Sequence, residues 1–270
     1  MSDHLSNRAW LEEETARRYK IFVEKTTMYQ ELSQCLVDLA GIEPGMQVLD
    51  LGCGTGVSTG IVLARLENRG HVCAVDISGP MLAVAREQVT SPQVRFFEAD
   101  AADIAELFQD EPLFDRVVCS SVFWQLRHKS QVLTALQRVL APDGLFIFNV
   151  PEPYFIFKNI PRSPKVSLLF KQLAAERYGV GRQDLRTMEL FLNQHDFEPV
   201  TTKEFTRVRS SEESHLFFQL PVASAWMDPP LDYETRLALL DEARQLAEPD
   251  KTVQQRWIYF VVRSKRRREN

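Results

Sequence analysis

A glycine-rich segment, Gly52-Cys53-Gly54-Thr55-Gly56, joins an apolar run to a helix that the pattern predicts to begin near Val57. Glycines in such a turn tolerate positive φ angles and let a ligand come close to the backbone. The unpaired amides at the start of the helix favour polar or anionic groups of a ligand. We therefore expect this segment to form a cofactor-binding loop.

The spacing within this loop excludes two common classes of cofactor. A dinucleotide loop needs a glycine at the position that Val57 occupies. A Walker loop needs a lysine, and the segment has none. Asp50, at the end of the preceding apolar run, would also repel a pyrophosphate. The remaining interpretation is a cofactor with a cationic amino-acid end, whose ammonium group Asp50 would help to hold, directly or through water.

Two further acids follow apolar runs downstream. Asp76 ends the segment Cys73-Ala74-Val75-Asp76, and Asp100 ends Phe96-Phe97-Glu98-Ala99-Asp100. A carboxylate at the end of a strand beside the glycine loop can accept hydrogen bonds from both hydroxyls of a ribose. Asp100 would accept a hydrogen bond from an adenine amino group. In an open α/β sheet these acids gather at the carboxyl ends of the strands, where ligands bind.

The elements that must position these residues alternate between strands and helices. Continuous apolar runs without polar alternation are typical of strands buried on both faces. Amphipathic helical patterns lie between them, and the last of these is predicted to end at Pro142-Asp143-Gly144. This alternation predicts an α/β fold with a doubly wound sheet. The predicted strands are Gln47–Leu51, His71–Val75, Val94–Phe97, Arg116–Cys119 and Leu145–Val150, followed by strands near 198–209 and 257–262 and a helix near 185–194.

Composition is that of an ordinary globular chain. Of the 270 residues, 44% are hydrophobic and 26% charged, which argues against a disordered or membrane-spanning chain. The formal net charge of −5 provides no field that would attract nucleic acid. The four cysteines form no CxxC motif, and the five histidines have no metal-binding spacing. We expect a cytoplasmic protein with free thiols and no metal site, and the sequence leaves its oligomeric state open.

Five motifs in this order resemble those of class I S-adenosylmethionine-dependent methyltransferases over about residues 25–150. They are the glycine loop with its acid (50–56), the second strand end with the following Met81-Leu82 (75–82), the third strand end (98–101), the fourth strand (114–118) and the turn at 140–144. The resemblance implies a seven-stranded, mostly parallel sheet of order 3-2-1-4-5-7-6 whose last strand is antiparallel. It implies S-adenosylmethionine as cofactor and S-adenosylhomocysteine as product.

The same resemblance implies roles for individual residues. The glycine loop with Asp50 and Cys53 would surround the methionine portion, and Asp76 would bind the ribose. The adenine would lie between the side chains of Ile77 and Met81, and its edge would contact Asp100 and the backbone amide of Ala101. The backbone carbonyl of Ser120, after the fourth strand, would accept a hydrogen bond from the ammonium group. The cofactor-binding residues implied in this way are Asp50, Gly52, Cys53, Gly54, Gly56, Asp76, Ile77, Met81, Asp100, Ala101 and Ser120.

For catalytic and substrate-binding residues the sequence offers candidates rather than motifs. His128 is a candidate base, with a surface or capping role as the alternative. Tyr19 would contact the methionine end or act as a phenolic base, unless its helix simply packs on the sheet. Trp124 and Gln125 would line the site of methyl transfer, with a position in the hydrophobic core as the alternative for Trp124. Their segment resembles that of methyltransferases of small carboxylic acids, in which the pair is inverted to Gln-Trp.

The domain organisation expected is a single methyltransferase domain over residues 1–270. An N-terminal cap helix (1–28) precedes the cofactor-binding core (29–150). Two lid insertions (151–183 and 211–250) interrupt the remaining core (184–210 and 251–264), and their aromatic and basic residues predict a small-molecule pocket. The expected reaction is methyl transfer to a small molecule, on oxygen or carbon. The alternative is a relative that binds S-adenosylmethionine without methylating, such as a cyclase or cofactor-positioning protein.

Overall fold

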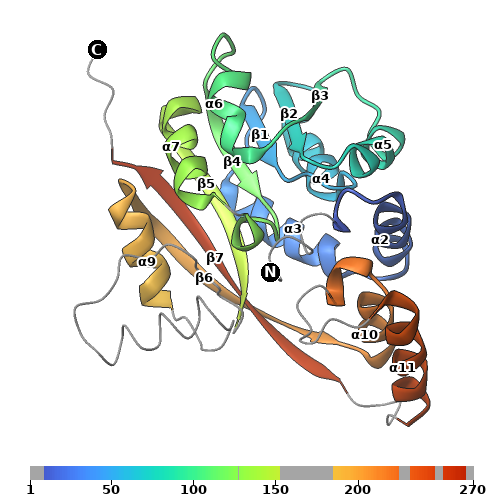
Figure 1. Cartoon of the computed structure of the whole chain (residues 1–270). Coiled ribbons are helices and arrows are strands. Elements are labelled where there is room, and N and C mark those ends of the chain that lie inside the picture. Colours follow the sequence, from blue (N-terminus) through green and yellow to red (C-terminus); the bar gives the residue numbers. More distant parts are fainter. Residues whose placement is uncertain (1–8, 127, 153–184, 225–231, 247–251, 266–270) are drawn as a thin grey trace.

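The computed structural model describes residues 9–126, 128–152, 185–224, 232–246 and 252–265. They build a seven-stranded sheet of order β3-β2-β1-β4-β5-β7-β6, with helices on both faces (Figure 1). Strands β1 to β5 are parallel, whereas β7 runs antiparallel to both of its neighbours. The predicted fold class and strand order are confirmed. Most of the predicted lid insertion 151–183 lies outside the described residues, which leave out 153–184.

The first four strands carry the predicted motifs at their carboxyl ends. They are β1 (Gln47–Leu51), β2 (His71–Asp76), β3 (Val94–Glu98) and β4 (Phe114–Cys119). The apolar runs of β1, β2 and β4 are largely buried, as a central parallel sheet requires. The prediction of burial on both faces is wrong for β3, whose residues are half-buried or exposed. This strand lies at the edge of the sheet, where only β2 pairs with it.

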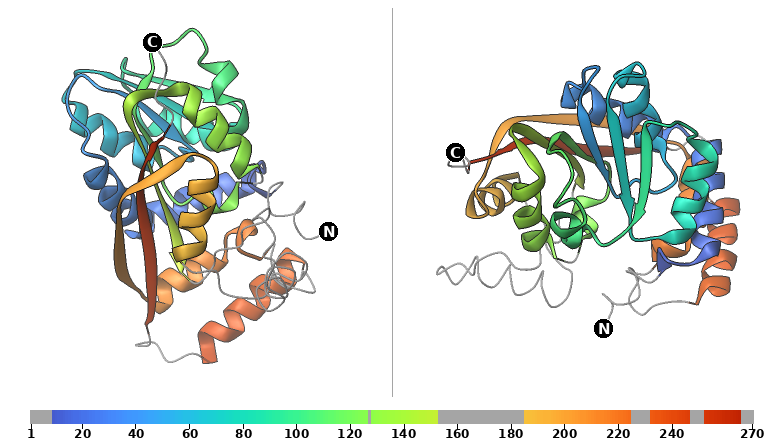
Figure 2. Two further views of the ribbon diagram at one scale, coloured as in Figure 1. Left: turned by 90° about the vertical axis from the view of Figure 1, so that its left-hand side faces the viewer. Right: turned by 90° about the horizontal axis from the view of Figure 1, so that it is seen from above.

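Helices of two groups cover the two faces of the sheet (Figure 2). Leu49 and Phe146 point to one face and pack with residues of α6, α7 and α9. Val48 and Ile147 point to the other face, where residues of α3 and α4 pack. Alternate residues of a strand face opposite layers, so one strand supplies both cores. The helices are α3 (Met28–Ala40), α4 (Val57–Leu66), α5 (Gly79–Gln88), η1 (Ala101–Asp103), α6 (Ile104–Leu107), α7 (Lys129–Val139) and α9 (Leu185–Gln194).

Strand β5 (Leu140–Glu152) begins five residues earlier than the sequence predicts, because the Pro142-Asp143-Gly144 segment belongs to the strand. The pairing with β4 changes register between Phe114 and Arg116, which accommodates this irregular stretch. A Cβ at Gly144 would come within 2.8 Å of the Phe114 carbonyl oxygen. The predicted turn is therefore an irregular strand start, held close to its neighbour by a glycine. Strands β6 (Phe197–Arg209) and β7 (Val253–Ser264) complete the sheet.

Further helices gather at the end of the molecule near the carboxyl ends of the first strands (Figure 1). Within the predicted N-terminal cap (1–28), of which residues 1–8 lie outside the described part, the structure has α2 (Glu13–Lys25), which ends before Thr26, where the backbone is extended. Helix α2 packs against α10 (Ser211–Phe218) through Phe22 and Phe217, whose ring centroids are 5.9 Å apart. The remaining elements here are η2 (Phe123–Gln125), η3 (Pro221–Ser224) and α11 (Tyr233–Leu246).

Candidate functional site

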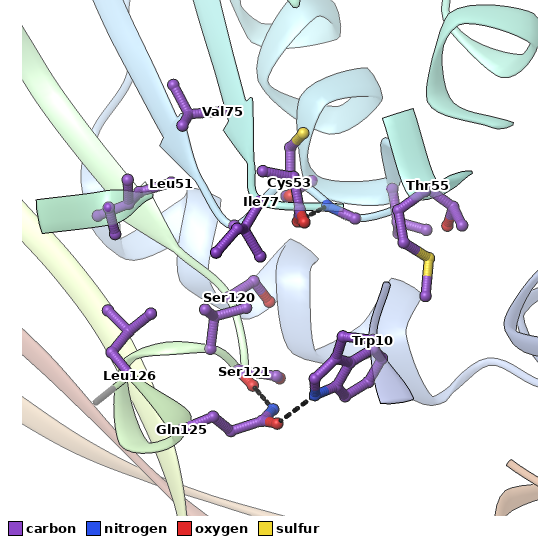
Figure 3. A pocket seen from close by; sticks show the side chains of 18 of the residues that line it. Trp10, Leu51, Cys53, Thr55, Val75, Ile77, Ser120, Ser121, Gln125 and Leu126 are labelled. Carbon is purple, nitrogen blue, oxygen red and sulfur yellow. Dashed lines mark hydrogen bonds between the residues drawn. The ribbon is translucent and has the colours of Figure 1, made fainter. Parts of the chain in front are cut away.

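A cavity opens at the carboxyl ends of β1, β2, β3 and β4 (Figure 3). It encloses about 1210 Å³ of space, with open water at its mouth included. The cavity lies where the chain reverses direction along the sheet, between β1 and β4, which is the usual ligand site of open α/β sheets. Its walls include the glycine loop after β1 and residues at or just after the ends of β2, β3 and β4. The fold therefore brings the predicted motifs together.

The three loop glycines all have positive φ, but they serve different purposes. A Cβ at Gly52 would come within 2.6 Å of a methyl carbon of Val122, so this glycine is required for packing against the loop after β4. Gly54 has φ +53°, and a Cβ there would have no atom within 4 Å. Because Gly54 lines the cavity, a side chain at this position would occupy the space that a ligand needs. Gly56 precedes α4 and packs near Val89.

Asp76 at the end of β2 is held in place by backbone amides. Its two carboxylate oxygens accept hydrogen bonds from Gly54 N (2.8 Å) and Ser78 N (2.9 Å). Burial raises the pKa of Asp76, while these backbone donors act in the opposite direction. Next to it, Ile77 is 48% exposed although it is a large apolar residue, and it lines the cavity. A fixed carboxylate beside an exposed apolar surface suits a ribose next to a base.

Asp100 and Ala101 form the third wall of the cavity, together with Met81. The Asp100 carboxylate accepts a hydrogen bond from Ala102 N (2.9 Å) and so caps the short helix η1. Met81 is buried on α5, whose first turn is capped by Ser78. The structure therefore places the predicted adenine-binding residues on one side of the cavity, next to Asp76.

The Asp50 carboxylate is fully buried and does not line the cavity. Ser58 Oγ and Thr59 Oγ1 donate to one of its oxygens at 2.8 and 2.7 Å. Burial raises its pKa to about 6, against the effect of these two donors. Contact between Asp50 and an ammonium, directly or through water, stays a prediction.

Gln125 and Trp10 meet at the other end of the cavity (Figure 3). The indole Nε1 of Trp10 donates to Gln125 Oε1 at 3.1 Å, and Gln125 Nε2 donates to the Ser121 carbonyl at 2.9 Å. Ser121 has φ +62°, which turns the chain sharply after β4. Of the predicted pair, Gln125 lines the cavity, whereas Trp124 packs against the core, as its alternative stated.

Hydroxyl groups line the wall contributed by α2 and α3. The Tyr19 and Tyr29 rings lie 4.9 Å apart, and Ser33 Oγ is 3.0 Å from Ser120 Oγ. Burial raises the pKa of Tyr29 to about 12. Burial, and then the neighbouring Tyr29, raise the pKa of Tyr19 well above its ordinary value. Both phenols keep their protons near neutral pH, which disfavours Tyr19 as a phenolic base and favours both as hydrogen-bond donors.

The other predicted residues divide between the cavity wall and its rim. His128 is exposed, lines the cavity and precedes α7 without capping it through its side chain. Cys53 lines the cavity as a buried thiol whose pKa burial raises well above its ordinary value. All four cysteines are free. Among the described residues, no group of three or more His, Cys, Asp or Glu could hold a metal ion, and no helix is long and apolar enough to cross a membrane.

Sequence reasoning gave no site role to Trp10, Tyr29 or Ser33, which all line the cavity. The available signal was their position on apolar-periodic segments before the glycine loop. That pattern is identical for core and cavity residues, so it does not separate the two. Only the packing of α2 and α3 over the strand ends shows which of these side chains face the cavity.

Comparisons with known proteins agree with this geometry. Residues 48–144 match the family described as a methyltransferase domain. The chain is 32% identical over 124 residues to the ubiquinone/menaquinone biosynthesis C-methyltransferase UbiE of Vibrio vulnificus, a match that covers 44% of this chain and 46% of the relative. It is 36% identical over 106 residues to a trans-aconitate 2-methyltransferase of Methylobacterium nodulans, covering 39% of this chain and 38% of the relative. The chain thus spans less than half the length of these curated relatives.

Solved structures show the same fold at low sequence identity. A putative methyltransferase from Bacillus halodurans superposes with a TM-score of 0.54 at 16% identity, covering 86% of this chain and 98% of the other. A methyltransferase from Geobacter sulfurreducens, solved with S-adenosylhomocysteine, gives a TM-score of 0.53 at 16% identity over 92% of this chain and 98% of the other. The chain therefore shares the fold of these two methyltransferase structures.

The residues that line the cavity fit S-adenosylmethionine, the cofactor that the sequence motifs imply. Gly54 leaves open space where a side chain would stand, and Asp76 presents an oriented carboxylate. Within the described residues, the hydroxyls of Thr55 and Ser121 are buried at the cavity wall without a hydrogen-bond partner. Buried polar groups are nearly always hydrogen-bonded in native proteins, so these hydroxyls indicate a polar ligand.

Proposed function

We propose that this chain, whose residues 48–144 belong to the methyltransferase-domain family, binds S-adenosylmethionine and transfers its methyl group to a small-molecule acceptor. The observation that carries this proposal is one cavity that combines an open glycine approach at Gly54, an oriented carboxylate at Asp76 and a polar edge at Asp100. These groups match the methionine, ribose and adenine portions of the cofactor in that order along the sheet.

The protein's part in such a reaction is to align the acceptor and exclude water. When bound, the cofactor supplies an activated methyl group with a good leaving group, so the chain needs no nucleophile of its own. Tyr19 and Tyr29 stay protonated and offer hydrogen bonds. His128 is the one imidazole on the described cavity wall, and it is our candidate for accepting a proton where the acceptor has one to lose. A carboxylate acceptor would need no base.

The acceptor that we propose is a small molecule methylated on oxygen or carbon. The name of one relative specifies a C-methyltransferase, which supports carbon. Another relative is named a methyltransferase of trans-aconitate, a carboxylic acid whose oxygens are possible acceptors, which is compatible with oxygen. Gln125 would contact the acceptor, because it lines the cavity opposite the cofactor-binding loop. The basic residues of segment 153–184, on which the expectation of a basic rim rests, lie outside the described residues.

A binding measurement combined with product analysis tests the proposal. Calorimetry should detect binding of S-adenosylmethionine to the purified protein. Mass spectrometry after incubation with a small-molecule extract of the host cells should find a product heavier by one methylene group, together with an equal amount of S-adenosylhomocysteine. Absence of binding would refute the cofactor assignment.

Binding without any methylated product would favour the alternative, a non-methylating relative. Structures with this fold include a [4+2]-cyclase, SpnF, at a TM-score of 0.51 and 18% identity. The fold alone therefore does not decide between the two functions. The release of S-adenosylhomocysteine in step with product distinguishes them, because a cyclisation leaves the methyl group on the cofactor.

A further inference from the structure

Trp10 contacts both halves of the cavity through two different groups. Its backbone carbonyl accepts a hydrogen bond from Ser78 Oγ at 2.7 Å, and its indole Nε1 donates to Gln125 Oε1 at 3.1 Å. Ser78 follows β2 beside the ribose-binding Asp76, and Gln125 follows β4 at the acceptor end. Trp10, which precedes α2, therefore contacts the wall beside Asp76 and the wall formed by Gln125, and Figure 3 shows its contact with Gln125.

These contacts form a continuous series of hydrogen bonds across the site. Ser78 N donates to Asp76 Oδ1, and Ser78 Oγ donates to the Trp10 carbonyl. The Trp10 indole donates to Gln125, whose amide nitrogen donates to the Ser121 carbonyl. The Trp10 ring also meets Tyr19 edge-on, with centroids 5.9 Å apart. Trp10 is thus fixed at its carbonyl, its ring and its indole N–H, although it lies at the start of the described chain.

The Gln125 amide gains a defined orientation from this arrangement. A glutamine side chain has two N–H donors and two acceptor lone pairs. One donor is used by Ser121 and one lone pair by Trp10, so the oxygen and nitrogen of the amide cannot exchange places without losing both bonds. One N–H and one lone pair remain for a ligand in the cavity that Gln125 lines. Without Trp10 the amide could rotate, and its polarity towards the acceptor would no longer be defined.

We propose that Trp10 is a positioning residue that joins the cofactor half of the site to the acceptor half, closing the cavity over the cofactor and orienting Gln125 towards the acceptor. The proposal rests on the proposed function, because it takes the Asp76 side as the cofactor half. It predicts that S-adenosylhomocysteine leaves more slowly while the Trp10–Gln125 bond is intact. It also predicts that binding of the cofactor orders the segment around Trp10.

The test compares Trp10→Phe, which keeps an aromatic ring but removes the N–H, with Gln125→Met, which keeps the length of the side chain but removes both the acceptor for Trp10 and the donor to Ser121. The dissociation rate of S-adenosylhomocysteine is measured by surface plasmon resonance for the wild type, both single variants and the double variant. Loss of one such hydrogen bond should raise the dissociation rate roughly 3- to 10-fold. Because both substitutions remove the same bond, the double variant should dissociate no faster than the faster single variant.

Leu11→Ala is the matched control, because Leu11 neighbours Trp10, is 45% exposed and does not line the cavity. It should leave the dissociation rate unchanged. In addition, hydrogen exchange of the amides of α2 should slow when S-adenosylhomocysteine binds to the wild type and change less in Trp10→Phe.

Several results would overturn the proposal. Additive effects in the double variant, or single variants that dissociate like the wild type, would show that the bond does not hold the cofactor. Equal slowing of hydrogen exchange in the wild type and in Trp10→Phe would show that the segment around Trp10 becomes ordered without the bond to Gln125. If the wild type binds S-adenosylhomocysteine but the comparison with the variants gives one of these results, only the role of Trp10 is refuted. A wild type that binds none refutes the proposed function and this role together.

Discussion

Replacement of Asp76 by alanine provides a quantitative test of the ribose-binding assignment. Both carboxylate oxygens are already oriented by Gly54 N and Ser78 N, and each retains a lone pair for a ribose hydroxyl. A hydrogen bond to a charged group contributes about 1.5–3 kcal/mol, and water that enters the vacated space recovers part of the loss. We therefore expect binding to weaken by about 1–3 kcal/mol, which is a roughly 5- to 150-fold rise in Kd.

The assay is calorimetric titration with S-adenosylhomocysteine, alongside a thermal melt that confirms folding. Glu98→Ala is the matched control, because Glu98 pairs in register with Asp76 on the neighbouring strand, is exposed and does not line the cavity. Both variants lose one negative charge, so a long-range electrostatic effect would weaken the binding of S-adenosylhomocysteine in both. A folded Asp76→Ala variant whose Kd stays within twofold of the wild type would refute the assignment. Since burial raises the pKa of Asp76, wild-type affinity should also begin to fall at a higher pH than for an ordinary aspartate.

Three other predictions concern the loop and the wall of the cavity. Gly54→Val should abolish cofactor binding in calorimetry, because the valine side chain would enter the open space of the cavity. The protein should still fold, since a valine at φ +53° costs only about 1–2 kcal/mol. Normal binding by a folded variant would contradict this prediction. The folded-state pKa of Asp50, about 6, exceeds its ordinary 3.8, so its protonated form stabilises the fold and that contribution is lost as pH rises from about 4 through 6. Asp50→Asn should thus raise stability to urea by roughly 3 kcal/mol at pH 8 and little at pH 4, and equal effects at both would disprove the account. Tyr19→Phe should leave the shape of the pH–rate profile unchanged, because Tyr19 stays protonated in the wild type; loss of a basic limb would reinstate it as a base.

The part of the cavity wall that we propose for the cofactor could be predicted from the sequence because its signals are local. Asp76 and Asp100 each follow a strand that a short apolar run identifies, and the glycine loop lies between a strand and its helix. In a doubly wound sheet the ends of such strands converge by topology alone. The structure accordingly brings Gly54, Asp76 and Asp100 to one cavity without any need for side-chain detail.

Errors at the level of elements also have physical reasons. The edge position of β3 could not be read from its apolar residues, because composition does not show how many strands lie beyond it. Strand β5 extends back through Pro142-Asp143-Gly144, where pairing with β4 overrides a local turn signal. Asp50 lies near the end of its strand, as Asp76 does, but its side chain lies inside the protein, where Ser58 and Thr59 donate to it; position along the sequence does not show this burial.

By itself, then, the sequence determined the sheet, the loop and the acids that we propose for the cofactor site, because each is encoded within a few neighbouring residues. Only the tertiary structure decided which residues form the proposed acceptor half. The contact between Trp10 and Gln125 joins residues 115 positions apart, and that between Ser33 and Ser120 joins residues 87 apart. Such contacts depend on how α2 and α3 pack over the ends of the strands, and no local pattern distinguishes an aromatic residue facing a cavity from one facing a core.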